Sequence, residues 1–113
     1  MERVEALILP ASLFEQGSTT ISSIVANFGV LTGKPPVIAR FGTNEAQHYA
    51  QVGWVDSVSQ DKDGLKGQLV IPKEGADKFN KGELDVRGQI SLEATKNVVH
   101  AARLVEVRLI PKQ

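Results

Sequence analysis

The stretch GWVDSVSQDKDGLKGQLVIP, residues 53–72, has the pattern of a β-hairpin. Two runs of alternating apolar and polar residues flank the tetrapeptide DKDG, whose aspartates and glycine suit a short reversing turn. The alternation places Trp54 and Val58 on one face of the first strand. One face of the second strand carries Leu65, Leu69 and Ile71. We therefore expect a β-hairpin here, and it is the clearest element that the sequence predicts.

Further strands are predicted on both sides of the hairpin. They cover residues 2–9, 37–41, 86–94 and 99–110, and the segment 73–82 is a polar connection with room for one helical turn. A helix is expected at 19–28, where apolar residues recur at the spacing i, i+3, i+4 and i+7. The chain is thus expected to be mainly β: a small antiparallel barrel or rolled sheet of about six strands, with one or two short helices. Residues 1–113 are expected to form a single domain with Trp54 and Leu104 in its core.

Composition argues against several classes of function. The 13 lysines and arginines equal the 13 aspartates and glutamates, so no net positive charge attracts nucleic acid or an anionic membrane. No apolar run approaches the roughly 20 residues of a membrane-spanning helix. The chain has no cysteine, and its two histidines lack the spacing of metal ligands. We expect no metal, no cofactor, no nucleic-acid partner and no membrane partner.

Four segments, read in order, resemble a known family. They are the hairpin itself, KGEL at 81–84, VRGQISLEA at 86–94 and AARLVEVRLIPK at 101–112. LPASLFEQGS at 9–18 adds a fifth segment. Together they resemble the phage prohead maturation proteases, which are serine proteases related in fold to the herpesvirus assemblins. The closing strand would carry Ala102, Leu104, Glu106, Val107, Leu109 and Pro111.

The resemblance implies a catalytic role for Ser91, which falls at the place of the family's nucleophile. A serine needs a base within hydrogen-bond reach, usually a histidine held by a third group. His48 would be that base, and His100 or Glu93 would orient it. Backbone N–H groups beside Ser91 would stabilise the oxyanion.

This chain also departs from the family pattern. The family places its catalytic histidine just after the strand that corresponds to PPVIARFG, whereas residues 40–44 here read RFGTN. Ser91 is followed by Leu-Glu-Ala and not by a small, glycine-containing stretch. Such a chain would keep the shape of the fold and lose most of its catalytic rate.

Three functions remain open from the sequence. The first is a non-catalytic structural protein of a phage head, a decoration or cement protein that binds the capsid lattice. Its partners would be the major capsid protein and further copies of itself, as a dimer or trimer, in a virion assembled in the host cytoplasm. The second is an active serine endopeptidase that cleaves scaffold or capsid chains through Ser91. The third is an unrelated small β domain in which Ser91 is an ordinary strand residue.

Overall fold

The computed structural model describes residues 1–14, 17–30, 33–39, 50–95 and 98–112, with the backbone alone described at 94, 95 and 98–100. The strands are β1 (Glu2–Pro10), β2 (Pro36–Ala39), β3 (Ala50–Asp61), β4 (Gly64–Ile71), β5 (Leu84–Thr95) and β6 (Val98–Pro111). The helices are the 3-10 turn η1 (Ala11–Leu13), α1 (Gly17–Ala26) and α2 (Lys73–Asn80).

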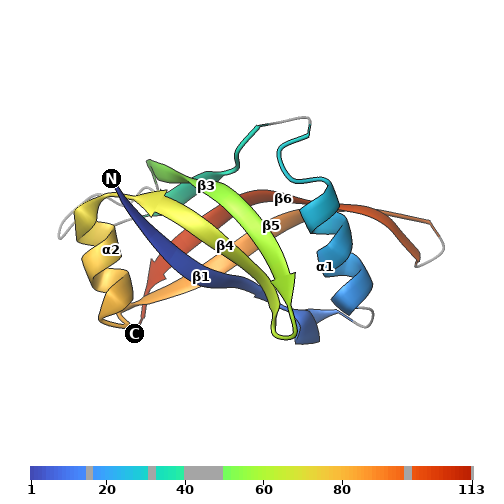
Figure 1. Cartoon of the computed structure of the whole chain (residues 1–113), viewed down its shortest axis with the longest axis horizontal. Helices are drawn as coiled ribbons and strands as arrows, with labels where there is room; N and C mark the ends of the chain where they lie inside the picture. The colour runs from blue at the N-terminus through green and yellow to red at the C-terminus, as the bar shows by residue number, and fades with distance from the viewer. Residues whose placement is uncertain (15–16, 31–32, 40–49, 96–97, 113) are drawn as a thin grey trace.

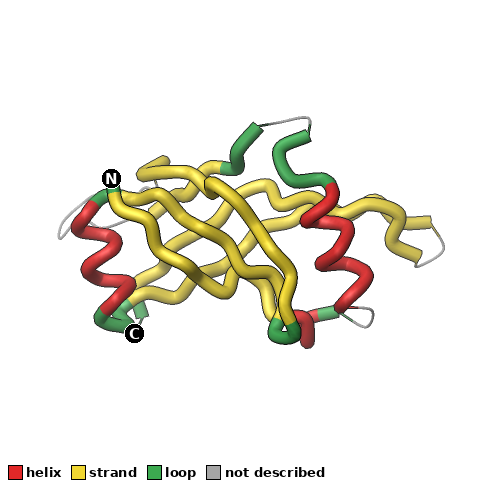
Figure 2. The backbone as a smooth tube through the Cα atoms, viewed as in Figure 1, coloured by secondary structure: helices red, strands yellow, loops and turns green. Residues whose placement is uncertain are grey.

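Among the described residues the six strands form one sheet in the order β1-β4-β3-β2-β6-β5. The sheet curls into a half-barrel, and Figure 1 shows β1 crossing in front of β5. Figure 2 shows α1 and α2 at opposite ends of this sheet. The predicted rolled sheet with two short helices is confirmed. One neighbouring pair, β2 with β6, is parallel and not antiparallel, so the sheet is mixed.

The β3–β4 hairpin forms as predicted. Its turn is held by the Asp61 side chain, whose Oδ1 accepts hydrogen bonds from the backbone N–H groups of Asp63 at 2.8 Å and Gly64 at 3.2 Å. An aspartate that binds the backbone two residues later is typical of a tight turn. The predicted inner face of the second strand is buried: Leu65, Leu69 and Ile71. Leu104 is also buried, as expected.

The prediction that Trp54 lies in the core is wrong. Trp54 is 37% exposed, whereas its neighbour Val55 is fully buried. The pairing of β3 with β4 shifts between Val55 and Ser57, so Asp56 is an extra residue in a β-bulge. A bulge reverses the alternation of faces beyond it. Trp54 therefore faces outward while Val58 packs against the core.

The helix α1 covers the edge of β6 that faces away from β5, over a part where no described strand pairs with that edge. It spans Gly17–Ala26, two residues earlier than the predicted 19–28. The strand β2 pairs with β6 only through its residues 37–39. Further along β6, Ala102 donates its N–H to Ser23 Oγ at 2.9 Å, and its carbonyl accepts from Asn27 Nδ2 at 3.2 Å. The helix thus satisfies strand groups that would otherwise lack a partner.

The helix α2 has two turns where one was predicted. It ends in a Schellman motif: Gly82 N–H donates to the Phe79 carbonyl at 2.9 Å and Glu83 N–H to the Lys78 carbonyl at 3.0 Å. Gly82 has φ of 74°, a conformation that favours glycine. The glycine that the sequence placed in a polar connection is therefore the signal that ends a helix.

The side chain of Ile8 brings the two edges of the half-barrel together. A bulge in β1 leaves Ile8 unpaired between Leu7 and Leu9, and turns Ile8 and Leu9 inward, where they are 1% and 5% exposed. A Cβ added at Gly67 would lie 2.4 Å from Ile8 Cδ1, and one added at Gly88 would lie 2.6 Å from Ile8 Cγ2. Glycine is required in both β4 and β5 because Ile8 occupies the space of their side chains.

We expect Gly67→Ala to lower the free energy of unfolding by about 1–3 kcal/mol, because the new methyl overlaps Ile8 Cδ1. Ile8→Val removes Cδ1, so the double variant should recover part of that loss, a coupling of about 0.5–3 kcal/mol. Urea denaturation of the single and double variants measures both quantities.

Gly88→Ala is the matched control for this coupling. Its methyl overlaps Ile8 Cγ2, which valine retains, so Ile8→Val should not rescue it. Additive effects of Gly67→Ala and Ile8→Val would contradict the assigned contact.

Candidate functional site

Ser91 lies on β5 with Arg103 of β6 as its Cα partner. Its neighbours Ile90 and Leu92 pair with the buried residues Leu104 and Ala102, so Ser91 points to the outer face, where it is exposed. Its hydroxyl forms no hydrogen bond with another described residue. Ser91 is therefore freely accessible on the outer face of the sheet.

The two histidines of the predicted site are placed only in part. His48 lies outside the described residues. The backbone of His100 lies in β6, at a second bulge where pairing passes from Ala101 to Val99. His100 is three residues along β6 from Arg103, the partner of Ser91, which is about 10 Å of strand. The strand register thus offsets His100 from Ser91 along the hairpin.

The third predicted group, Glu93, is exposed and pairs with Ala101. It lies on the same face of β5 as Ser91, because β5 alternates regularly and the extra residues are all on β6.

Among the described residues, no group of three or more His, Asp or Glu side chains is arranged to hold a metal ion. No helix within the described ranges is long and apolar enough to cross a membrane.

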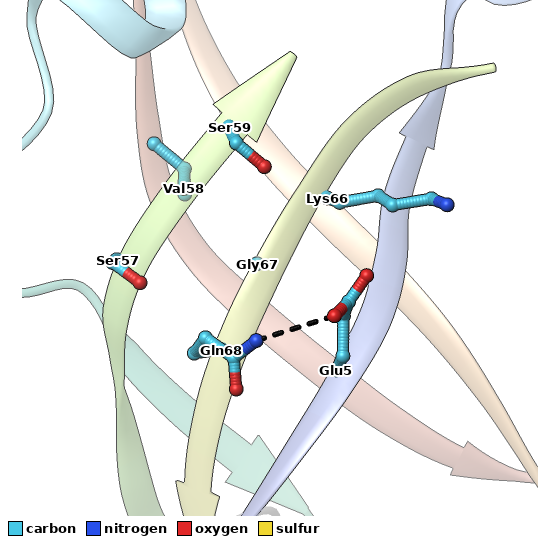
Figure 3. A pocket seen from close by; sticks show the side chains of 7 residues that line it. All are labelled: Glu5, Ser57, Val58, Ser59, Lys66, Gly67 and Gln68. Atoms are coloured by element: carbon cyan, nitrogen blue, oxygen red, sulfur yellow. Dashed lines mark hydrogen bonds between the residues drawn. The ribbon is translucent and has the colours of Figure 1, made fainter. Parts of the chain in front are cut away.

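A small polar hollow lies on the outer face over β1, β3 and β4 (Figure 3). It is lined by Glu5, Ser57, Val58, Ser59, Lys66, Gly67 and Gln68. Gln68 Nε2 donates to Glu5 Oε2 at 3.4 Å. The volume of about 130 Å³ is room for a few waters and is below the usual size of ligand pockets. We interpret it as a solvated sheet surface.

The positive charge of Lys66, at the edge of this hollow, is already neutralised by Asp61. Lys66 Nζ lies 2.8 Å from Asp61 Oδ2. The hydrogen bond from Lys66, together with those from the backbone of Asp63 and Gly64, lowers the pKa of Asp61. The same contact with Asp61 raises the pKa of Lys66. Lys66 is therefore held as a cation and cannot serve as a base for the nearby serines.

A second, apolar hollow of about 320 Å³ lies where the two edges of the sheet meet. We call it the apolar hollow, and its lining is Ile8, Leu9, Pro10, Leu13, Val86, Arg87, Gly88 and Gln89. Leu13 is 63% exposed at its rim. Its size falls at the lower end of the range for ligand pockets. It is open to an apolar group of modest size.

An exposed tryptophan and three charged residues form a patch on the outer face of the sheet. We call Arg3, Lys34, Trp54 and Asp56 the Trp54 patch. Arg3 and Trp54 both pair with Val70 and therefore lie in one row across β1, β4 and β3. Asp56 accepts hydrogen bonds from Arg3 Nη1 and from Lys34 Nζ.

The electrostatics of the Trp54 patch are well defined. Hydrogen bonds from Lys34 and from Arg3 lower the pKa of Asp56 from 3.8 to about 2. The carboxylate is thus ionised at neutral pH, and it holds two cationic side chains, Arg3 and Lys34, which are 61% and 54% exposed.

Sequence reasoning missed the Trp54 patch because it placed Trp54 in the core. A signal was present in Asp56, a charged residue at a position that regular alternation would share with Trp54 and Val58.

Comparison of the chain with protein-family models, with curated proteins and with solved structures gives no match.

The Asp56 ion pairs should make stability depend on pH. Because its pKa is lower in the folded state, Asp56 contributes its full stabilisation above about pH 3.8, and this is lost as the pH falls through about 2. Asp56→Asn should therefore be less stable than the wild type at about pH 6, and the difference should narrow as the pH falls toward 2. Urea denaturation at a series of pH values measures it.

Salt provides the control. At about 1 M salt the Debye length is near 3 Å, so screening should shrink the difference between Asp56→Asn and the wild type at neutral pH. A difference that is constant across pH and salt would contradict the electrostatic role of Asp56.

Proposed function

We propose that this protein is a structural protein of a phage head, a decoration or cement protein that binds and stabilises the capsid lattice. The single observation that carries a binding role is the exposed Trp54 on the outer face of the sheet. Tryptophan and arginine are enriched at protein interfaces and dominate their binding energy. The Trp54 patch contains both within one row of paired strands.

The ion pairs of the patch support the same role. Arg3 and Lys34 share one carboxylate, so both long side chains are positioned before any partner arrives. Pre-positioned side chains lose less conformational entropy on binding. The net charge of zero means that affinity would come from shape and apolar contact and not from long-range attraction.

The capsid as partner follows from the resemblance to prohead maturation proteases. The order of the hairpin, the KGEL segment, the Ser91 strand and the closing strand supports it. Such a fold without a complete catalytic set would retain the surface that meets capsid chains.

Co-sedimentation with heads assembled from the major capsid protein of the same genome tests the proposal. The wild-type chain should sediment with the heads, and Trp54→Ala should weaken binding roughly tenfold or more, because it removes the central aromatic contact. Val105→Ala is the matched control, since Val105 is 47% exposed but lies on β6. A genome without a capsid gene, or a wild-type chain that stays in the supernatant, would overturn the proposal.

Reaction with a fluorophosphonate probe separates this proposal from a serine endopeptidase. A structural protein should leave Ser91 unlabelled, because a serine hydroxyl reacts only with a base in reach. A known serine protease in the same reaction confirms that the probe is active. Labelling that disappears in Ser91→Ala would establish the protease instead.

A further inference from the structure

The outer edge of β5 is an open strand edge. β5 pairs with β6 on one side and has no strand partner on the other among the described residues. Its 12 residues are regular, because the extra residues at both bulges of this hairpin belong to β6. They include no proline and no lysine. Natural sheets usually protect an edge with such residues or with a bulge, so an unprotected edge indicates pairing with another strand.

The other edge of the sheet has those protections. β1 contains the bulge at Ile8 and ends in Pro10. The contrast singles out β5 as the edge that is suited to a partner.

The side chains of β5 are self-complementary about Ile90. Arg87 lies three residues before it and Glu93 three residues after it. Both are exposed, and neither forms an ion pair with another described residue. On the opposite face of the strand, Leu92 is 48% exposed although it is apolar.

We propose that the partner is a second copy of this chain, whose β5 pairs antiparallel with the first β5 about a twofold axis at Ile90. This register places Arg87 opposite Glu93 of the second copy, and Glu93 opposite Arg87 of the second copy. Opposite charges directly across strands stabilise a sheet. The twofold axis closes the assembly as a dimer.

The apolar hollow strengthens this register. Pairing about Ile90 places Leu92 of the second copy opposite Gly88, where Ile8 fills the space of the missing side chain. Gly88 borders the apolar hollow, whose rim includes the exposed Leu13. Each Leu92 would therefore be covered by the hollow of the other copy.

Neighbouring registers are less favourable. A twofold axis at Ser91 would place Glu93 opposite Gln89 and would lose both ion pairs. An axis at Gln89 would place Glu93 opposite Asp85, and like charges across strands are destabilising. The ion pairs thus select the axis at Ile90.

The dimer is independent of the capsid-binding proposal. The Trp54 patch lies on β1, β3 and the segment before β2, so pairing through β5 would leave it free. The self-association is a property of the purified chain, and it would hold or fail whether or not the chain binds heads.

Sedimentation velocity of the full chain over a range of concentrations tests the dimer. The wild type should sediment with twice the 12.2 kDa mass of one chain. Arg87→Glu and Glu93→Arg should each raise the dimer Kd roughly tenfold or more, since each sets two pairs of like charges across the axis. Arg87→Glu/Glu93→Arg exchanges the charges and should return the Kd to within about threefold of the wild type.

The matched control is Lys62→Glu, a charge reversal at an exposed position of the β3–β4 turn, which should leave the Kd unchanged. Amide hydrogen exchange gives a second readout: residues 87–93 should exchange more slowly as the concentration of the chain rises. A monomeric wild type would overturn the proposal. So would a dimer that neither charge reversal weakens, or one that the double variant fails to restore.

Discussion

The contact of Ile8 with Gly67 and Gly88 is the constraint on which the half-barrel depends. It joins β1 to β5 by packing, and these two strands are not neighbours in the hydrogen-bonded order. Packing brings the edges of the sheet together without pairing their backbone groups. The half-barrel therefore keeps an open strand edge at β5, with the apolar hollow beside it. A barrel closed by hydrogen bonds would have neither feature.

Three of the β-bulges in the described strands determine which side chains face solvent. The bulge at Ile8 turns two successive apolar residues inward. The bulge at Asp56 keeps Trp54 outside and sets Asp56 within reach of Arg3 and Lys34. The bulge at Val105 leaves that residue 47% exposed between buried positions of β6. In each case one extra residue changes which of the following side chains face solvent.

These bulges also separate the features that could be predicted from the sequence from those that could not. The DKDG turn and the inner face of β4 follow from local chemistry, and both were predicted. Alternation alone could not place Trp54, because the bulge depends on pairing with β4 and its one mark in the sequence of β3 is the charge of Asp56. Asp56 binds Arg3, which lies 53 positions before it, and Lys34, which lies 22 positions before it. No local pattern in the sequence specifies contacts over such separations. The parallel pairing of β2 with β6 is likewise a property of the whole chain.

The stretch RGQISLEA can be understood through its place in the sheet. As a motif it draws attention to Ser91, whose chemistry depends on a base elsewhere in the chain. As an edge strand it draws attention to Arg87 and Glu93. Their spacing about Ile90 is visible in the sequence, but it can form ion pairs with another strand only where the edge is free.

The two interpretations make different demands on the surrounding structure. A nucleophile needs a partner held at hydrogen-bond distance within one chain, whereas an edge strand needs regular backbone and complementary side chains. The regularity of β5 beside a doubly bulged β6 meets the second demand directly. In the proposed dimer the same eight residues serve an interaction between chains, with Ser91 as one of its small polar members.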